Sequence, residues 1–239
     1  MSSLGDRLFT WAVNVVQKYV VPLGVKFRMR RRNRLVGTPS SEFQEKVRQL
    51  GIPAEALWWG PMTLFPRKAM ELIKAIESAP PTAVLEIGSG SSTPILAALA
   101  IKYDFKLVSL ENHGDSLRYV KSIMGDLAAD DHIELCLAGF CKKSAPDGGR
   151  YRWYDIDLAK FGMKFDFVII DGPMGTLVGR EGGLPEVRGH LAKSHQIYLD
   201  DAQRSHEQAC IRQWKNWFPE LVVESIDGCP GMARMRLIS

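Results

Sequence analysis

Cysteines are few in this sequence, and their spacing suggests no pairing. Four occur in 239 residues, at Cys136, Cys141, Cys210 and Cys229, with no C-x-x-C pair and no histidine at zinc-finger spacing. This pattern excludes the disulfide framework of small secreted domains, does not indicate a structural zinc site and fits a reducing, cytoplasmic compartment. Cys136 and Cys210 are expected to be small buried hydrophobic residues.

Long uninterrupted hydrophobic runs are also missing. Residues 4–20 have no basic segment before the apolar part and no small-residue cleavage site, which excludes a signal peptide. Gln17, Lys18 and Pro22 interrupt the run, which argues against a transmembrane helix. At about 100° per residue the apolar side chains share one broad face, so the pattern predicts an amphipathic helix over 4–20. That face holds Leu4, Leu8, Phe9, Trp11, Ala12, Val15, Val16, Tyr19 and Val20.

Outside the N-terminus the chain has no excess of positive charge. Residues 1–34 carry a net charge of +7 and the remainder −3, which together give +4. A nucleic-acid partner for the main part of the chain is therefore not indicated. Six cations lie in residues 26–34, directly after the amphipathic helix, a pattern typical of peripheral contact with an anionic cytoplasmic membrane face. Packing of the helix on the rest of the protein, or on a second copy in a homo-oligomer, is the open alternative.

The remainder is rich enough in apolar residues to form a sizeable core. With 46% hydrophobic residues, the chain suits an α/β domain over 41–239 preceded by a helical and basic extension over 1–36. Strand-like and helix-like runs alternate, which predicts a doubly wound, Rossmann-like parallel sheet covered on both faces. The last two strands are joined by a short turn and must be antiparallel. Strands are expected over 83–87, 106–110, 133–137, 165–170, 196–199, 221–226 and 233–238, and helices over 41–50, 66–78, 94–99, 115–124 and 205–218.

The central feature is a glycine-serine turn within residues 84–93, between an apolar strand and a helix. Glycines let a ligand approach the backbone, and the helix directs free amides at the turn. The third glycine of a dinucleotide site and the Gly-Lys-Ser/Thr of a P-loop are both absent. The pattern Glu86-x-Gly88-x-Gly90 resembles the first motif of class I S-adenosylmethionine (SAM)-dependent methyltransferases. A tight turn that merely ends a buried strand is the alternative.

The resemblance implies a seven-stranded, mostly parallel methyltransferase sheet over residues 66–239, with SAM as cofactor. Glu86 would lie near the ammonium of SAM, and Phe140 would touch the adenine ring. Glu111 ends the second strand, where an acid can accept hydrogen bonds from both ribose hydroxyls; alternatively it answers the dipole of the helix that follows. The cofactor residues expected on this basis are Glu86, Gly88, Gly90, Ser91, Ser92, Glu111, Asn112, Gly139, Phe140 and Asp171.

Three acids end the fourth and fifth strands, at Asp171, Asp200 and Asp201. Clustered carboxylates must be protonated, paired with cations or bound to a metal. The arrangement resembles the magnesium site of catechol-type and antibiotic-sugar O-methyltransferases, which implies Mg²⁺ on these residues and Asp171 as a catalytic residue. The chain departs from that pattern, because Gly172-Pro173 follows the first acid and no lysine evidently serves as a base.

Several further residues are candidates for the substrate side of the site. Residues 179–185 are expected to form a mobile loop in which Arg180 meets an anionic substrate group. His206 is a candidate general base, and Arg204 either contacts an anion or pairs with Asp200 or Asp201. The insertion over 141–163 is expected to be irregular and to shape a substrate pocket. Bulky residues that form either a lid or ordinary core are Trp58, Trp59 and Met62.

The sequence therefore predicts a SAM-dependent methyltransferase. Its substrate would be a hydroxyl oxygen of a small molecule, a saccharide or a lipid-linked intermediate. An aminopropyl transferase on the same sheet, and a non-catalytic scaffold at the membrane, are the alternatives.

Overall fold

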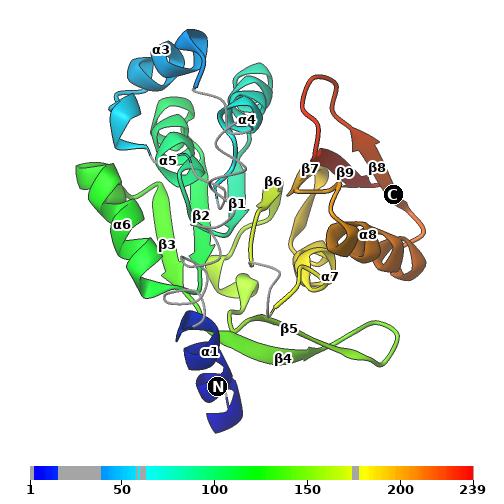
Figure 1. The fold of residues 1–239 in the computed structure, drawn as a ribbon. Coiled ribbons are helices and arrows are strands. Elements are labelled where there is room, and N and C mark those ends of the chain that lie inside the picture. The colour runs from blue at the N-terminus through cyan, green and yellow to red at the C-terminus, as the bar shows by residue number, and fades with distance from the viewer. Residues whose placement is uncertain (1–2, 16–38, 58, 60–62, 174–177, 239) are drawn as a thin grey trace.

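A computed structural model describes residues 3–15, 39–57, 59, 63–173 and 178–238. Its centre is a seven-stranded sheet with the order β3-β2-β1-β6-β7-β9-β8 (Figure 1). The five strands from β3 to β7 are parallel, whereas β9 runs antiparallel to both β7 and β8. The doubly wound sheet with a terminal hairpin is therefore confirmed. The strands are β1 (Ala83–Ile87), β2 (Lys106–Glu111), β3 (Ile133–Leu137), β6 (Phe165–Ile170), β7 (Leu191–Asp200), β8 (Leu221–Ser225) and β9 (Met232–Leu237).

Helices cover both faces of this sheet because successive residues of the buried strands point to opposite sides. Val84 of β1 belongs to a core formed with α3, α4, α5 and α6, whereas Leu85 belongs to a core formed with α7 and α8. Figure 1 shows these two groups of helices beside the sheet. The helices are α1 (Leu4–Val15), α3 (Ser41–Gln49), α4 (Pro66–Ser78), α5 (Ser92–Tyr103), α6 (Gly114–Met124), α7 (Gly183–Arg188) and α8 (Ser205–Trp217), with short 3₁₀ helices at Ala54–Ala56, Gly125–Ala129 and Leu158–Phe161.

Two segments expected to lack regular structure contain regular elements: the expectation of an irregular insertion over 141–163 was wrong, and that of a loop over 179–185 holds for residues 179–182 only. Much of the insertion over 141–163 is a two-stranded hairpin of β4 (Phe140–Ser144) and β5 (Arg150–Tyr154). Its alternating buried side chains pack under the sheet, which explains why it pairs. The expected loop over 179–185 leads directly into α7. Trp214 contacts this segment through a hydrogen bond from its Nε1 to the Glu181 carbonyl at 2.7 Å.

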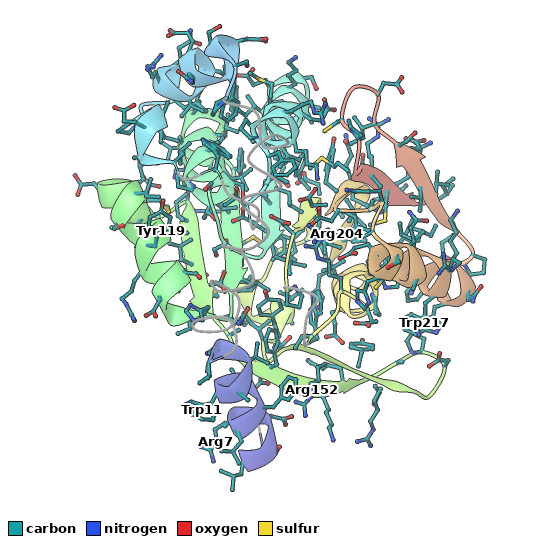
Figure 2. All side chains as sticks on the ribbon, viewed as in Figure 1. Arg7, Trp11, Tyr119, Arg152, Arg204 and Trp217 are labelled. Atoms are coloured by element: carbon teal, nitrogen blue, oxygen red, sulfur yellow. The ribbon has the colours of Figure 1, made fainter. Side chains whose placement is uncertain are left out.

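Helix α1 packs against the β4–β5 hairpin and carries apolar residues on both sides. On its inner side Asp6 accepts a hydrogen bond from Arg152 at 3.0 Å, and the Arg152 guanidinium lies 3.6 Å from the Phe9 ring centroid. On its outer side Leu4, Leu8 and Trp11 are 66%, 59% and 66% exposed, and Trp11 projects away from the molecule in Figure 2.

The N-terminal segment is only partly covered by the structure. The predicted helix is present up to Val15, and residues 16–20 and 26–34 lie outside the described residues. The described part of the helix therefore packs on the rest of the protein, which is one of the alternatives that the sequence analysis left open. Among the described residues, no helix combines the length and the apolarity that crossing a bilayer needs.

Candidate functional site

The glycine turn after β1 folds across the ends of its neighbouring strands. The amides of Gly88 and Ser89 donate to the Leu110 carbonyl of β2 at 2.9 and 3.2 Å. On the other side, the Ile87 carbonyl accepts from the amides of Asp171 and Gly172 at 3.0 and 2.6 Å. The turn thus fixes the carboxyl ends of β2 and β6 beside one another, where ligands of open α/β sheets bind.

The two glycines of the turn have different surroundings. Gly88 has φ +98°, and a Cβ there would lie 2.7 Å from the backbone nitrogen of Gly172. Gly88 is therefore required by the close approach of two backbones. A Cβ at Gly90 would have no atom within 4 Å, so this glycine borders open space.

Glu86 is fully buried, and its carboxylate is held by hydroxyl groups of the chain itself. It accepts hydrogen bonds from Ser92 Oγ at 2.6 Å, Thr93 Oγ1 at 2.7 Å and Ser109 Oγ at 2.5 Å. Burial raises the pKa of Glu86, and these hydroxyls oppose the rise. Glu86 is thus part of the turn's framework, and at 0% exposure it does not reach a ligand ammonium as the resemblance implied.

The serines at the start of α5 complete this framework. Ser91 and Ser92 are buried, and Thr93 Oγ1 accepts from the Gly90 amide at 2.9 Å while it donates to Glu86. The hydroxyls thereby link the acid of β1 to the first turn of α5 and hold the turn in one conformation.

Glu111 ends β2 with one carboxylate oxygen occupied and one available. Its Oε1 accepts from the backbone amides of Asn112 and His113, both at 2.7 Å. Oε2 accepts no hydrogen bond from any described residue, although the side chain is only 7% exposed. Burial raises the pKa of Glu111 to about 7, with a contribution from nearby Glu86, against the two amide hydrogen bonds. Both sequence interpretations of Glu111 agree with this geometry.

Helix α1 covers the edge of the site formed by the ends of β2 and β3. Thr10 Oγ1 accepts from the Phe140 amide at 2.8 Å and lies where a Cβ of Gly139 would be crowded, at 3.1 Å. Asn112 Nδ2 donates to Asn14 Oδ1 at 3.2 Å. The sequence analysis missed this contact between the N-terminal helix and three predicted cofactor residues.

The Phe140 ring does not face open space. It is 1% exposed and packs on Tyr154 with ring centroids 5.1 Å apart. The expected stacking on an adenine ring therefore has no exposed ring face to use. Trp59, one of the candidate lid residues, packs edge-on against Phe43 of α3, and Trp58 and Met62 lie outside the described residues.

The three acids at the ends of β6 and β7 do lie together, with ligand atoms of Asp171, Asp200 and Asp201 within 4.8 Å of one another. Each contacts a cation. Lys68 Nζ bonds directly to Asp200 and lies 3.8 Å from Asp201, and Arg204 contacts Asp201 at 2.7 Å. The expected alternative of an Arg204 pair is therefore present.

Arg180 is the third of these cations, and its contacts do not support the expected role toward a substrate anion. It is 3% exposed, bonds to the backbone carbonyls of Asp171 and Asp200, and lies 3.3 Å from the Asp171 carboxylate. Both terminal nitrogens of this buried guanidinium bond to the protein's own oxygens, and Nε is buried without a hydrogen-bond partner among the described residues. No donor of Arg180 is therefore exposed to a substrate anion.

These cations test the predicted magnesium site. Lys68, Arg180 and Arg204 compensate the charge of the three carboxylates, which is the service that Mg²⁺ would otherwise supply. Burial and the neighbouring Asp200 nevertheless raise the pKa of Asp171 well above its usual range, and the pKa of Asp201 rises for the same reasons. The cluster is thus a compact salt-bridge network, and its residues do not fit a preformed divalent-cation site.

Lys68 is the functional residue that the sequence analysis missed. It lies in the first turn of α4, and at 2% exposure it shares the buried face of that helix with Leu72 and Ile76. A lysine at i, i+4 spacing on an apolar stripe was the signal, because a buried cation needs a partner.

His206 is turned away from the aspartates as far as its contacts show. Its Nε2 lies 3.4 Å from Glu181 Oε1, and no contact joins it to Asp171 within the described part of the chain. Its role as a general base stays a prediction, and its closest described partner is Glu181.

No protein-family model matches this chain, and no curated protein matches its sequence. The fold is shared with solved methyltransferase structures. An O-methyltransferase from Bacillus cereus, solved with SAH, has a TM-score of 0.53 at 16% identity over 89% of this chain and 96% of its own. SAH-bound PaMTH1 from Podospora anserina has 0.52 at 15% over 83% and 87%. TomG from Streptomyces achromogenes, solved with SAM, has 0.51 at 13% over 90% and 96%. The chain therefore has the class I methyltransferase fold.

Proposed function

We propose that this protein is a SAM-dependent methyltransferase that acts on a hydroxyl oxygen of a small molecule. The observation that carries the proposal is Glu111, whose Oε1 is fixed by two backbone amides and whose Oε2 is available beside the glycine turn. An acceptor fixed at the end of the second strand suits a ribose diol. SAM, when bound, supplies a methyl group activated by a positively charged sulfur.

The charge around the turn supports a cationic ligand. Within the described residues no lysine or arginine forms an ion pair with Glu86 or Glu111, so these buried acids are held by neutral hydroxyl and amide donors. A cation in the adjoining space would stabilise the ionised form of Glu111. Gly90 leaves that space open, and a dinucleotide pyrophosphate would be repelled there.

The aspartate network supports the proton transfer that O-methylation needs. Asp171 is the proposed general base, because its side chain is 17% exposed next to the glycine turn and its raised pKa suits accepting a hydroxyl proton. Lys68 and Arg180 are positioning residues that hold the carboxylates. No step is assigned to Mg²⁺, since cations of the chain compensate the charge.

A peripheral membrane contact is proposed for the N-terminal segment. The exposed stripe of Leu4, Leu8 and Trp11 on α1 precedes a run of six cations in residues 26–34. Apolar side chains next to basic residues suit an anionic bilayer surface. Cosedimentation with phosphatidylserine vesicles should fall strongly for Trp11→Ala and should be weak with phosphatidylcholine vesicles; equal binding to both lipids would refute an electrostatic contact.

The activity is tested by incubation of the protein with methyl-labelled SAM and a panel of diols, sugars and phenols. Label should appear in the product with wild-type protein and should fall by about 100-fold or more with Asp171→Asn, since a positioned base contributes about 10²–10⁴-fold. In a parallel incubation with decarboxylated SAM and a polyamine acceptor, aminopropyl transfer without methyl transfer from SAM would favour the spermidine-synthase type of enzyme. SAM binding without any transfer would favour a non-catalytic scaffold.

A further inference from the structure

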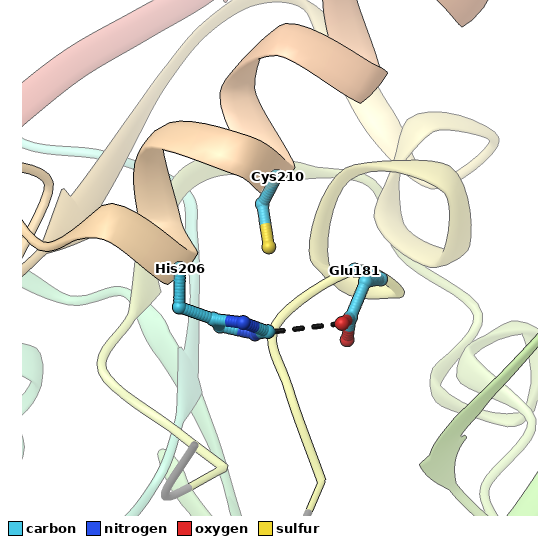
Figure 3. A group of neighbouring side chains, drawn as sticks. All are labelled: Glu181, His206 and Cys210. Carbon is cyan, nitrogen blue, oxygen red and sulfur yellow. Dashed lines mark ion pairs between the residues drawn. The ribbon is translucent and has the colours of Figure 1, made fainter.

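A second cluster of chemically active side chains lies next to the aspartate network and takes no part in the proposed methyl transfer. It consists of Glu181, His206 and Cys210, whose ligand atoms all lie within 4.8 Å of one another. Figure 3 shows the three side chains converging, two from α8 and one from the segment before α7. His206 and Cys210 are four residues apart on one helix, so they project from the same face.

The contact between Glu181 and His206 is close but is not a hydrogen bond. His206 Nε2 is buried and has no hydrogen-bond partner among the described residues, although Glu181 Oε1 is 3.4 Å away. Two ligands of one tetrahedral zinc ion, each about 2.1 Å from the metal, would lie about 3.4 Å apart. The pair therefore has the separation of two ligands on one coordination sphere.

The backbone at Gly179 leaves room for these donors. A Cβ there would lie 2.2 Å from both His206 Nε2 and a Glu181 carboxylate oxygen. A larger residue at position 179 would place its Cβ between the Glu181 and His206 side chains and force them to move. Glycine at this position therefore allows the two side chains to approach one another.

The third donor is a buried thiol. Cys210 is 1% exposed, and burial, with the nearby carboxylates of Glu181 and Glu207, raises its pKa to about 12. The backbone amide of Arg180 opposes that rise through a hydrogen bond to the sulfur, the type of amide contact that orients metal-bound ligands. Without a metal the side chain is a neutral thiol, and coordination would release one proton as the metal–sulfur bond forms.

We propose that Glu181, His206 and Cys210 bind one divalent transition-metal ion of the zinc type. A carboxylate, an imidazole and a thiolate form a donor set that zinc accepts and that Mg²⁺ and Ca²⁺ do not. Glu181 and His206 are 31% and 40% exposed, so the cluster lies near the surface although His206 Nε2 itself is buried. This site revises the sequence analysis, which considered only zinc-finger spacings and missed a ligand set drawn from two segments.

The ion would support the catalytic side of the molecule without touching it. Arg180 precedes Glu181 in the chain, and its guanidinium lies 3.3 Å from Asp171 and 3.9 Å from Asp201. A metal on Glu181 would fix the backbone that carries Arg180. The metal site does not depend on the methyltransferase proposal, because it rests on its own ligands.

Titration of the untagged full-length protein with Co²⁺, followed by displacement with Zn²⁺, tests this site. We expect one equivalent of Co²⁺ to bind with a near-ultraviolet thiolate-to-cobalt charge-transfer band, which Zn²⁺ then removes. Cys210→Ser should lose the band, and His206→Gln should lose stoichiometric binding. Cys136→Ser, which changes another buried cysteine outside the cluster, should keep both.

Three results would overturn the assignment. One is Co²⁺ binding without a thiolate band, which would place the ion on oxygen ligands such as the aspartates. Another is a band that persists in Cys210→Ser. Absence of any Co²⁺ binding to the wild-type protein is a third result and would overturn the assignment as well. Should Cys210→Ser fail to fold by circular dichroism, His206→Gln decides alone, because this half-exposed side chain can change without opening the core. SAM binding is measured separately, so either proposal can fail without the other.

Discussion

The two halves of the site hold their buried acids in opposite ways. At the ends of β1 and β2, the described residues that hold Glu86 and Glu111 do so through hydroxyls and backbone amides. At the ends of β6 and β7, the aspartates are held by Lys68, Arg180 and Arg204. Neutral donors satisfy oxygen lone pairs but leave the charge uncompensated, whereas cations remove it.

This difference indicates which half of the site is expected to bind a cationic ligand. The β1–β2 end has acids without a cationic partner among the described residues and an available carboxylate oxygen, which suits a positively charged cofactor with hydroxyl groups. The β6–β7 end is already balanced, so it suits a neutral hydroxyl whose proton is removed. Variants that remove a partner or an acid in one half of the site therefore test this difference most directly.

Removal of a cation from the balanced half should have the largest effect. Lys68→Met leaves Asp200 buried without its partner and should lower the free energy of unfolding by about 3–5 kcal/mol. Lys46→Met, which breaks a half-exposed pair with Glu77, should lower it by at most about 1 kcal/mol. Urea denaturation measures both. Equal losses in the two variants would show that the network contributes no more than a surface pair.

The turn between the two halves should show the next largest effect. Gly88→Ala forces a Cβ against the Gly172 backbone at a positive φ and should cost about 2–4 kcal/mol. Gly90→Ala meets no atom within 4 Å and should leave thermal stability nearly unchanged while it weakens SAM binding. If Gly90→Ala instead unfolded the protein and Gly88→Ala did not, the assignment of the two glycines would be reversed.

The contribution of Glu111, at the β1–β2 end of the site, to the stability of the protein should depend on pH. The pKa of Glu111 is about 7 in the folded protein against 4.5 for the free side chain. As pH rises through this window the unfolded state ionises first, so the ligand-free protein loses stability between about pH 4.5 and 7, by up to about 3 kcal/mol. Glu111→Gln lacks this loss, and its melting temperature should exceed that of the wild type by more at pH 8 than at pH 5. A gap that stays constant with pH would contradict the buried position of Glu111.

The contact of α1 with the edge of the site should show the smallest effect. Thr10→Val leaves the Phe140 amide without its acceptor and should cost about 1 kcal/mol. Leu8→Ala on the outer face, where Leu8 is 59% exposed, should cost less than about 0.5 kcal/mol. Thermal melts compare the two, and a larger loss for Leu8→Ala would mean that the outer face is covered.

Local sequence patterns predicted the sheet well. Periodic apolar runs located the parallel strands, and the short final turn required an antiparallel pair. The hairpin of β4 and β5 was missed because its exposed face is polar and its buried residues, such as Trp153, were attributed to a pocket. Helix α7 was missed because glycines at 179, 182 and 183 were interpreted as freedom of motion, whereas Gly182 and Gly183 pack closely on tryptophan side chains.

The partners of the site residues could not be predicted from local patterns. Glu86 could be placed at the turn, but the serines and threonine that surround its carboxylate come from two separate segments. Lys68 is 132 residues from Asp200, and no spacing rule joins them. The sequence placed the acids at the ends of the strands. The hydroxyls, amides and cations that contact each acid became apparent only in the three-dimensional structure.

Isothermal titration with SAM and with SAH, each with and without Mg²⁺, tests the central claim most directly. Three proteins are compared: the wild type, Glu111→Gln, and Glu134→Gln, whose side chain is 56% exposed on β3. The account predicts binding to the wild type and to Glu134→Gln, and about 10- to 100-fold weaker binding to Glu111→Gln, the loss of hydrogen bonds to a charged acceptor. Absence of binding to the wild type, or equal affinity for Glu111→Gln, would contradict it.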